Sequence, residues 1–533
     1  MLKSLPPSVP SKILFNLIKS AQKDPKLPPA NSTSAFWQEP PSSISTIQSP
    51  TLPTQTDYAI IGSGVTACSV AHNLLSQLPP DSKSTVTIFE ARSLCSGATG
   101  RNGGHLLSPI PEEFCNVEKF YGKEEAVKIA RFCDRTLEKM HALPELGGEE
   151  LVREAEVRKV KAVTGFWDEA KLEEAKRGME RYLELVVGEK KEGREGFKVL
   201  SREEAEKEFN LKSPIGAIQT PAGAFWPYRL ITGLYSLLLT QYPTRFSIDT
   251  RTPITVITHS PTTNPTHPYT LTTPRGPVHA TKVIHCTNGW AGHLLPGMRG
   301  KIYPIRGTMS VQSPSPSLPR EGGEKSWSTI DKTTYDPKDG SFSYGMYYIT
   351  QNAHTGDVFI GGEKQSLEEI LTADDSGVSS ISKTTLEGVL PSIFATGWKE
   401  GESPEVKSLW SGILAFTPDQ LPWVGKVPKS VTGRGGDGEW VAAGFNGYGM
   451  PLCWGCGEAV AGMLLGKERE VREWLPRSFE TTGRRLGSLF STPEAGVVGM
   501  LGVELGWVMM GRLVVGWIGR VVKGWVSSRL GGK

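Results

Sequence analysis

The chain has 533 residues, of which 59 are basic and 56 acidic, so its formal charge is only +3. A charge this balanced creates no strong field for a polyanion, and we therefore expect no nucleic-acid partner. Hydrophobic residues make up 38% of the chain and charged residues 22%, which excludes a wholly disordered protein. The length is that of several domains or of one large two-domain enzyme.

Cysteine usage indicates the compartment. Seven cysteines are spread thinly over the chain, and an odd, sparse set is not a disulfide framework. The first 20 residues contain three prolines and lack the continuous apolar core of a secretory signal. We therefore expect an intracellular protein, in the cytoplasm or, as alternatives, in a mitochondrion or on a membrane. The sequence has no zinc-ligand spacing, so we expect no metal site.

The first predicted unit of the fold begins near Asp57. Residues 1–56 are rich in proline, serine and threonine and are expected to form an irregular arm. After them, 58–61 is typical of a short buried strand, 65–78 of a helix and 85–90 of a second strand. This β-α-β order is that of half a mononucleotide-binding unit.

A glycine-rich turn joins the first strand to the helix, in the order Gly62, Ser63, Gly64, Val65, Thr66, Ala67. In a G-x-G-x-x-A turn the first glycine permits the tight turn and the second lets a pyrophosphate approach the backbone, while the small Ala67 allows close packing of helix on strand. Glu90 ends the second strand, where a carboxylate accepts hydrogen bonds from ribose hydroxyls and repels the 2′-phosphate of NADP. The turn therefore predicts a dinucleotide site.

A second G-x-G-x-x-G pattern occurs at Gly433, Gly435 and Gly438. It follows no apolar strand and leads into an expected strand at 440–443 rather than into a helix. We therefore interpret it as a flexible hairpin loop. Because the sequence has no second strand-supported motif of this kind, a reductase that takes electrons from NAD(P)H is disfavoured.

The segment after Glu90 carries a longer pattern. Ala91 and Arg92 precede a run of small residues that reads CSGATGRNGGH from Cys95 to His105. This pattern resembles the FAD-dependent D-amino-acid oxidase superfamily, and within it the branch similar to glycine, sarcosine and γ-glutamylputrescine oxidases. The resemblance implies that FAD lies against this loop and close to the charge of Arg101. The cofactor-binding residues implied here are Ala91, Arg92, Gly97, Ala98, Thr99, Arg101, Asn102, Gly103, Gly104 and His105.

The resemblance continues downstream in the family's order and covers about residues 57–466. The matching segments are AGAFWPYRL at 222–230, TNGWA at 287–291, YPIRG at 303–307, the segment 410–422 and AGFNGYGM at 443–450. A helix expected near Pro451 would turn its N-terminal amides toward the negative charge that develops on a flavin during reduction. The further cofactor-binding residues implied are Val256, Asn288, Trp290, Gly412, Asp419, Gly444, Phe445, Asn446, Gly447, Tyr448, Gly449 and Met450.

The fold implied by the resemblance is α/β, with a Rossmann-like FAD-binding domain interleaved with a mixed-sheet substrate domain, as in the D-amino-acid oxidase and glutathione-reductase-2-like fold. The expected FAD-binding parts are about 57–110, 200–300 and 405–466, and the expected substrate-domain parts are about 111–199 and 301–404. Residues 467–533 are expected to form a C-terminal extension. Within it, 493–526 is apolar with tryptophans and basic residues, so we expect it to dock on the protein, to self-associate or to contact a membrane surface.

We expect FAD to be bound without a covalent link. In relatives that attach the flavin, a cysteine stands at the place of Gly412 or a histidine at that of Arg101, and His105 is expected beside the flavin or in packing. The pair Cys453 and Cys456 has the spacing of a redox dithiol. Nothing thioredoxin-like surrounds the pair, so we favour helix packing.

These features together predict an oxidoreductase that removes a hydride from the carbon next to the nitrogen of a small amine or amino acid. The flavin accepts the hydride, the imine hydrolyses, and O2 reoxidises the flavin to give hydrogen peroxide. Tyr344, Tyr347 and Tyr348 on an expected strand are candidates to line the substrate site, and Arg306 to bind a carboxylate. The alternatives are a dehydrogenase that uses another electron carrier and a non-enzymatic assembly protein that FAD stabilises.

Overall fold

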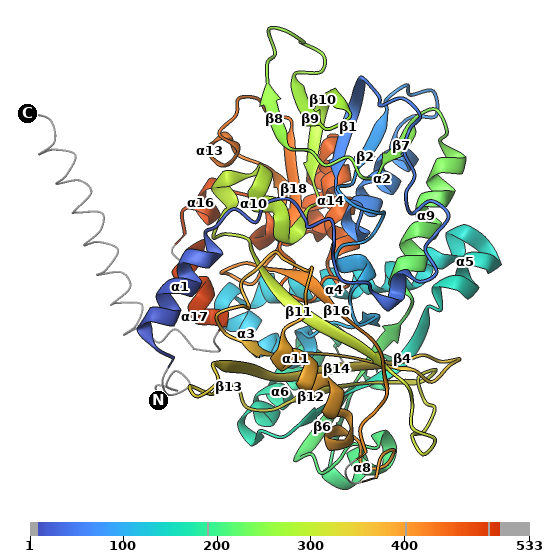
Figure 1. Ribbon diagram of the computed structural model, residues 1–533, viewed down its shortest axis with the longest axis vertical. Helices are drawn as coiled ribbons and strands as arrows, with labels where there is room; N and C mark the ends of the chain where they lie inside the picture. Colours follow the sequence, from blue (N-terminus) through green and yellow to red (C-terminus); the bar gives the residue numbers. More distant parts are fainter. Residues whose placement is uncertain (1–8, 189–190, 400–401, 489–490, 501–533) are drawn as a thin grey trace, which may run out of the picture.

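Two β-sheets organise the protein. The computed structural model describes residues 9–188, 191–399, 402–488 and 491–500. In Figure 1 the smaller sheet and its helices fill the upper half of the molecule, and the larger sheet fills the lower half, with β11 and β16 crossing the middle. The expected α/β class, with two sheets built from interleaved parts of the chain, is confirmed.

The smaller sheet is mostly parallel. Strands β18, β10, β1, β2 and β7 run parallel to one another, so the carboxyl ends of β1 and β10 meet at one edge. In an open α/β sheet this edge is where ligands bind. In sheet order its strands are β17 (Trp423–Lys426), β18 (Glu439–Ala443), β10 (Gly276–His285), β1 (Gln55–Ile61), β2 (Val86–Phe89) and β7 (Phe246–Asp249), with β9 (Tyr269–Thr273) joined to β10 and β8 (Val256–His259) joined to β9.

The larger sheet is mixed. Its β12 and β4 pair in parallel and its other pairs are antiparallel. The segments β3, β6 and β16 belong to it, although the sequence placed their residues in FAD-binding parts. In sheet order its strands are β16 (Val406–Phe416), β11 (Tyr303–Gln312), β15 (Val358–Ser366), β14 (Ser341–Gln351), β12 (Lys325–Ile330), β4 (Arg158–Phe166), β6 (Gly216–Ala224) and β3 (His105–Leu106), with β13 (Thr334–Tyr335) and β5 (Lys198–Leu200) at their sides.

Helices pack on both sheets, and their starts follow ordinary capping rules. Asp168 accepts a hydrogen bond from the Lys171 amide at the start of α6, and Ser201 and Glu204 form a capping box on α8. Residues 169–187, in which acidic and basic residues alternate, form α6 and one π-helical turn. The α-helices are α1 (Ser11–Ala21), α2 (Val65–Gln77), α3 (Ile110–Tyr121), α4 (Lys123–Ala142), α5 (Gly148–Ala155), α6 (Glu169–Tyr182), α7 (Lys191–Arg194), α8 (Arg202–Phe209), α9 (Pro227–Gln241), α10 (Ala291–Leu294), α11 (Ser380–Gly388), α12 (Leu390–Ile393), α13 (Lys429–Thr432), α14 (Cys453–Leu464), α15 (Glu468–Trp474), α16 (Gly483–Leu486) and α17 (Pro493–Met500).

The second glycine pattern, at Gly433, Gly435 and Gly438, lies between α13 and β18. The strand that follows it pairs antiparallel with β17, so this segment is the connection of a hairpin, as the sequence predicts. Its glycines are therefore not part of a second dinucleotide turn.

The N-terminal segment is more ordered than the irregular arm expected from its composition. Its α1 lies beside α17 at the left of Figure 1, and Leu17, Ala21 and Val497 are buried in one apolar cluster. Beyond α1 the arm is irregular apart from one 3-10 turn, and it is tied to the fold by hydrogen bonds to residues 90–102 and 249–250. Long-range burial of apolar side chains therefore orders a segment whose local composition favours a coil.

The C-terminal stretch 493–526 lies only partly within the described residues. Its first eight residues form α17, which packs against α1 and against the ring of Tyr303. The predicted contact with a membrane or a second copy concerns mainly 501–526, which lie outside the described residues. In the part of the chain that the structure describes, every helix is too short or too polar to cross a bilayer.

Trp37 is the main apolar anchor of the arm, so we predict that Trp37→Ala destabilises the whole fold. Its ring stacks on Phe359 of β15 at 4.0 Å between centroids and meets Trp226 edge-on at 5.1 Å, and only 4% of the residue is exposed. Loss of so large a buried side chain costs about 3–5 kcal/mol of unfolding free energy. Denaturant unfolding measures this cost. Phe15→Ala, at a site 66% exposed, is the control and should change stability by less than about 0.5 kcal/mol; equal effects would contradict the role of Trp37.

Candidate functional site

The turn after β1 brings two distant strands into contact. Gly62 has a φ of +103°, and a Cβ there would lie 2.6 Å from the carbonyl oxygen of Cys286 at the end of β10. Only glycine tolerates both the dihedral angle and this approach. Gly64 precedes α2, and Val65, Thr66 and Ala67 are buried in its first turn. The expected glycine turn therefore leads a helix N-terminus to the edge where β1 and β10 end.

Glu90 is held in place at the end of β2. One carboxylate oxygen accepts a hydrogen bond from the Ser63 hydroxyl at 2.6 Å, and the other accepts from the Arg92 amide at 2.9 Å. The Ser63 hydroxyl itself accepts from the amide of Cys95. Each carboxylate oxygen keeps a lone pair, so the group is oriented and still able to accept from ribose hydroxyls.

The small-residue loop after Ala91 is folded by its own polar groups. The side chain of Asn102 donates to the carbonyls of Ala98 and Thr99, at 3.1 and 2.8 Å, and accepts from the amide of Gly104. The Thr99 hydroxyl accepts from the Val65 amide at 3.0 Å, which ties the loop to the start of α2. The loop and the glycine turn therefore form one unit, in which Gly97 and Ala98 remain partly exposed.

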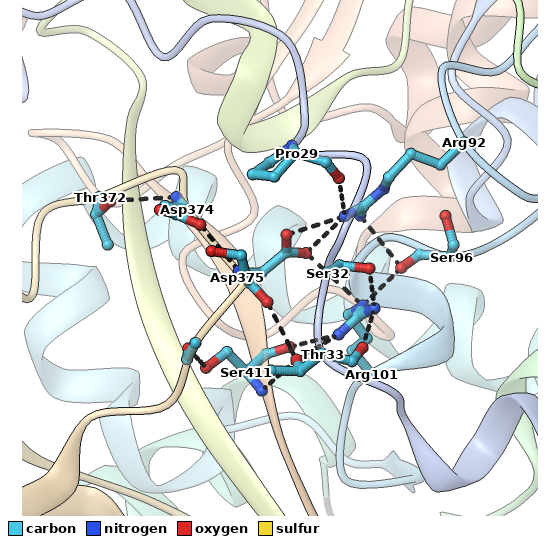
Figure 2. Close-up of polar contacts among 12 residues, drawn as sticks. Pro29, Ser32, Thr33, Arg92, Ser96, Arg101, Thr372, Asp374, Asp375 and Ser411 are labelled. Carbon is cyan, nitrogen blue, oxygen red and sulfur yellow. Dashed lines mark hydrogen bonds and ion pairs between the residues drawn. The ribbon is translucent and has the colours of Figure 1, made fainter.

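Arg101, which the resemblance implies as a cofactor-binding residue, has its guanidinium bonded to its own loop, to the N-terminal arm and to β16. It is 3% exposed, and Figure 2 shows its guanidinium among residues of the N-terminal arm. It donates to the Ser32 hydroxyl and Thr33 carbonyl, each at 2.7 Å, and to the Ser411 carbonyl at 2.8 Å. The N-terminal arm therefore binds the side chain of Arg101. The sequence did not connect this arm with the site.

Asp375 compensates two buried arginines in the same cluster. It is fully buried, and its carboxylate lies 2.9 Å from the Arg92 guanidinium and 3.7 Å from that of Arg101. Burial lowers the pKa of Arg101 to about 10, and the charge of Asp375 opposes that shift. Sequence analysis missed Asp375, because no local pattern connects it with residues almost 300 positions earlier.

The C-terminal segment reaches the same edge from β18. The Gly444 amide donates to the Asn288 side chain at 3.0 Å, and the Asn446 side chain accepts from the Thr417 amide at 2.8 Å. Phe445 is buried, Gly449 and Met450 are partly buried, and Gly447 and Tyr448 are exposed. Helix α14 begins three residues after Met450, close to the expected start. An amide-rich helix N-terminus therefore lies next to the end of β10.

Several buried polar atoms near this edge have no hydrogen-bond partner within the described residues, which fits a site for a polar cofactor. The Thr287 hydroxyl and the Trp290 indole N–H directly follow β10, and neither has a hydrogen-bond partner within the described residues. The same holds for Nε2 of His105. Burial lowers the pKa of His105 to about 4, so its ring is neutral at physiological pH. Phosphate and flavin oxygens are acceptors that such donors require.

Three expected cofactor residues lie in other surroundings. Val256 is 50% exposed on β8 and is paired with Thr272 of β9, so the structure does not bring it to the turn. Asp419 forms a two-pronged ion pair with Arg485 at 2.7 and 2.9 Å. A Cβ at Gly412 would lie 3.3 Å from the Cβ of Arg101, so this glycine contacts the loop rather than an open space.

The two cysteines of the C-x-x-C pattern are packing residues of α14. Both are free and buried, and Cys456 belongs to the main apolar cluster together with Cys453. Burial raises the pKa of Cys453 to about 12. A thiol that stays protonated is a poor nucleophile, which disfavours a dithiol redox site here.

The candidate substrate-site tyrosines are divided between the two faces of the larger sheet. The ring of Tyr348 would lie 2.8 Å from a Cβ at Gly103, and the Thr350 hydroxyl donates to the Gly103 carbonyl at 2.8 Å, so this face of β14 touches the loop. Tyr347 points to the opposite face, because side chains alternate along a strand, and it packs there beside Phe209 and Leu211. Tyr344 packs edge-on against Phe342. From the sequence, Tyr347 and Tyr348 were equal candidates to line the substrate site. Only the strand register shows that they lie on opposite faces of the sheet.

Arg306, which we expect to bind the carboxylate of a substrate, is already paired with an acidic side chain. Its guanidinium lies 3.2 Å from Glu369, and its side chain is only 12% exposed. Asp374 is close enough for the charge of Arg306 to contribute to lowering its pKa, after hydrogen bonds from Ser376. The described structure therefore gives Arg306 a local ionic role.

A parallel sheet with a glycine turn, an acidic residue at the end of its second strand and a neighbouring helix N-terminus define a dinucleotide-binding oxidoreductase fold. The chain belongs to the FAD dependent oxidoreductase family, whose family model matches residues 57–463. This confirms the resemblance identified in the sequence, and FAD is the cofactor of the family.

Similar proteins support the same fold. The chain is 23% identical over 426 residues to the probable oxidoreductase OrdL of Rhizobium meliloti (strain 1021), which covers 78% of this chain and 84% of that protein. It is similar to the structure of glycine oxidase from Geobacillus kaustophilus, with a TM-score of 0.56, 20% identity and coverage of 81% of this chain and 99% of that one. It is also similar to the structure of L-proline dehydrogenase from P. horikoshii, with a TM-score of 0.54, 20% identity and coverage of 80% of this chain and 98% of that one.

The position of Glu90 predicts that Glu90→Ala weakens FAD binding. Charge-assisted hydrogen bonds are each worth about 1.5–3 kcal/mol, so we expect about a ten- to hundredfold weaker affinity. Flavin fluorescence after exhaustive dialysis measures the FAD that remains. Asp81→Ala, on the exposed turn before β2, serves as the control. A Glu90→Ala protein that keeps as much FAD as the wild type would exclude the ribose role.

The buried cluster predicts that Asp375→Asn lowers stability strongly. The substitution leaves two buried guanidinium groups without their shared counterion, which costs about 3–5 kcal/mol. Unfolding in urea at pH 7 measures the loss. Asp374→Asn is the matched control, because Asp374 is exposed and bonds only to its own turn; its effect should stay below about 1 kcal/mol. Similar losses in both variants would refute a special role of Asp375.

Proposed function

We propose that the protein oxidises a C–N bond of a small amine or amino acid, with FAD as the hydride acceptor. The proposal is supported by one observation above all. Met346, Tyr348 and Thr350 alternate along β14 and so share a face, and this face contacts both flavin-related segments: Thr350 bonds Gly103, and the Tyr448 hydroxyl lies 3.7 Å from the Met346 sulfur. A substrate on this face would lie between the two segments. The printed names of similar structures, glycine oxidase and L-proline dehydrogenase, agree with such substrates.

The residues of the chain would act mainly by position. Glu90 would hold the ribose, and the glycine turn with the N-terminus of α2 would hold the phosphates. When bound, FAD supplies the oxidising power by taking a hydride from the carbon next to nitrogen. The amides from Gly444 to Gly449, together with the start of α14, would stabilise negative charge on the flavin ring. Tyr348 would form one wall of the site and exclude water from it.

We propose that FAD binds without a covalent link and that O2 is the electron acceptor. The absence of a cysteine at Gly412 and of a histidine at Arg101 supports non-covalent binding. The imine product would be released to water, where it hydrolyses. A dehydrogenase that uses another carrier differs only in the acceptor, so reoxidation of the reduced protein by air, with peroxide release, distinguishes the two.

An anaerobic screen tests the proposal directly. The purified FAD-loaded protein is mixed with primary amines, secondary amines and amino acids, and the absorbance of oxidised flavin near 450 nm is followed. We expect at least one compound to bleach the flavin, and Tyr348→Ala to slow bleaching by about 10-fold or more, as misplacement of a substrate does. Tyr347→Ala, on the opposite face, is the matched control. If no compound bleaches the flavin, the proposal fails, and a non-enzymatic role that FAD stabilises is favoured.

A further inference from the structure

One carboxyl group, that of Glu112, lies beside the proposed substrate face. Glu112 lies in the first turn of α3, and its carboxylate accepts a hydrogen bond from the Thr164 hydroxyl at 2.8 Å. Thr164 of β4 pairs with Ser328 of β12, which pairs with Tyr348 of β14. Cross-strand neighbours share a face. Glu112 therefore lies at the face that carries Tyr348, two strands or roughly 10 Å away along the sheet.

The same end of the face is reached by Tyr448. Its hydroxyl contacts Met346, which lies two residues before Tyr348 on β14. Surrounding protein raises the pKa of Tyr448, and the charges of Glu113 and Glu112 raise it further, so the two carboxyl groups are near this tyrosine. Glu112 and the C-terminal flavin-related segment thus border one region of the sheet from opposite sides.

The charge of Lys171 on α6 acts on the neighbouring Glu113, but not on Glu112. Burial raises the pKa of Glu112 to about 7, the hydrogen bond from Thr164 opposes this shift, and the charge of Glu113 adds to it. Within the described residues no lysine, arginine or histidine forms an ion pair with Glu112. A partly buried carboxylate without a counterion is costly, and an ammonium group from a ligand would reduce that cost.

Four arginines of the loop and of the larger sheet already have partners. Arg306 pairs with Glu369, Arg92 pairs with Asp375, and Arg101 is bonded to the arm. Arg158 of β4 donates to three backbone carbonyls, those of Glu156, Gly322 and Gln351. The carboxylate of an amino-acid substrate would therefore have to compete with an existing acid or carbonyl for each of these four guanidinium groups, of which only Arg92 and Arg306 keep an Nε–H without a partner within the described residues.

We infer that Glu112 binds the ammonium group of the substrate and accepts its proton, and that the substrates are amines without a carboxylate next to nitrogen. The inference rests on the proposed function and names its substrate class. The proton step is balanced: the N–H bond of R–CH2–NH3+ breaks, an O–H bond forms on Glu112, and one positive and one negative charge become two neutral groups. The neutral amine that results is the form able to lose a hydride. Glu112 therefore combines recognition with proton acceptance.

Binding of an amine that cannot react tests the role of Glu112 without any turnover. tert-Butylamine has no hydrogen on the carbon next to nitrogen, so it can bind but not be oxidised. Its dissociation constant is measured from the perturbation of the flavin spectrum in the FAD-loaded protein. We expect Glu112→Gln to weaken binding at least 10-fold and Glu112→Asp to weaken it less.

A neighbour on the same helix provides the matched control. Glu113→Gln removes the same charge one residue further on, where the side chain is more exposed than that of Glu112 and accepts a hydrogen bond from Asn116 at 2.9 Å. Because the charge of Glu113 raises the pKa of Glu112, this variant should bind tert-butylamine as tightly as the wild type or slightly more tightly. Unchanged binding in Glu112→Gln, or equal losses in both variants, would overturn the inference.

The pH dependence of binding provides a second readout. The groups around Glu112 are Thr164 of β4, its neighbour Glu113, Tyr448, and Lys171 and Glu174 of α6, whose charges act on Glu113. Because binding requires the ionised carboxylate, affinity in the wild type should fall as the pH drops through about 7. Thr164→Val removes a hydrogen bond that favours the ionised form, so it should move this fall to higher pH. An unchanged pH profile in Thr164→Val and Glu112→Gln would contradict the assignment.

Matched substrates separate this inference from the proposed function. Benzylamine and phenylglycine differ only in the carboxylate next to nitrogen, as do propylamine and 2-aminobutyrate. We expect the amine of a pair to bleach the flavin at least 10-fold faster. If the amino acids react faster, the inference is wrong and the proposed function stands. If nothing bleaches the flavin, the proposed function fails, and binding of tert-butylamine still decides whether Glu112 recognises ammonium groups.

Discussion

The close approach of Gly62 to the end of β10 constrains the rest of the site. Because a side chain at this position would overlap the Cys286 carbonyl, β1 can lie beside β10 in this register only with glycine at the turn. Parallel pairing then brings Thr287 and Asn288 to the same edge, and the hydrogen bond from Gly444 to Asn288 adds the segment after β18. Three segments separated by more than 150 residues each thus meet at one helix N-terminus.

Charge burial is the second constraint, and it explains why the N-terminal arm belongs to the functional unit. The loop after Glu90 contains two arginines, Arg92 and Arg101, that are almost completely buried. Without Asp375 and the polar groups of Ser32 and Thr33, their desolvation would oppose folding of the loop. The arm and the 372–379 loop therefore stabilise the loop after Glu90 by binding its two arginine side chains.

How much of this was predictable depends on the range of the interactions. The glycine turn, Glu90, the small-residue loop and the start of α14 are local patterns, and the sequence predicted each of them in place. The position of Tyr348, the pairing of Arg306 with Glu369 and the burial of Arg101 depend on strand register and on contacts between distant segments. A one-residue change in register exchanges the two faces of a strand, so the sequence alone could not choose between Tyr347 and Tyr348.

Val256 is a second residue whose position depends on strand pairing that the sequence alone does not give. Its strand has the alternation of a sheet element, and the sequence assigned it to the cofactor by family order. In the structure β8 pairs only with β9, and β9 in turn with β10, which leaves Val256 exposed. The residues that lie next to Glu90 are instead those at and just after the end of β7: the Asp249 carbonyl accepts from the Glu90 amide, and the Thr252 amide donates to the Glu90 carbonyl. The order in which strands pair, rather than distance along the chain, decides which residues approach the end of β2. The segment from Asp249 to Thr252, and not Val256, can therefore influence a group held by Glu90.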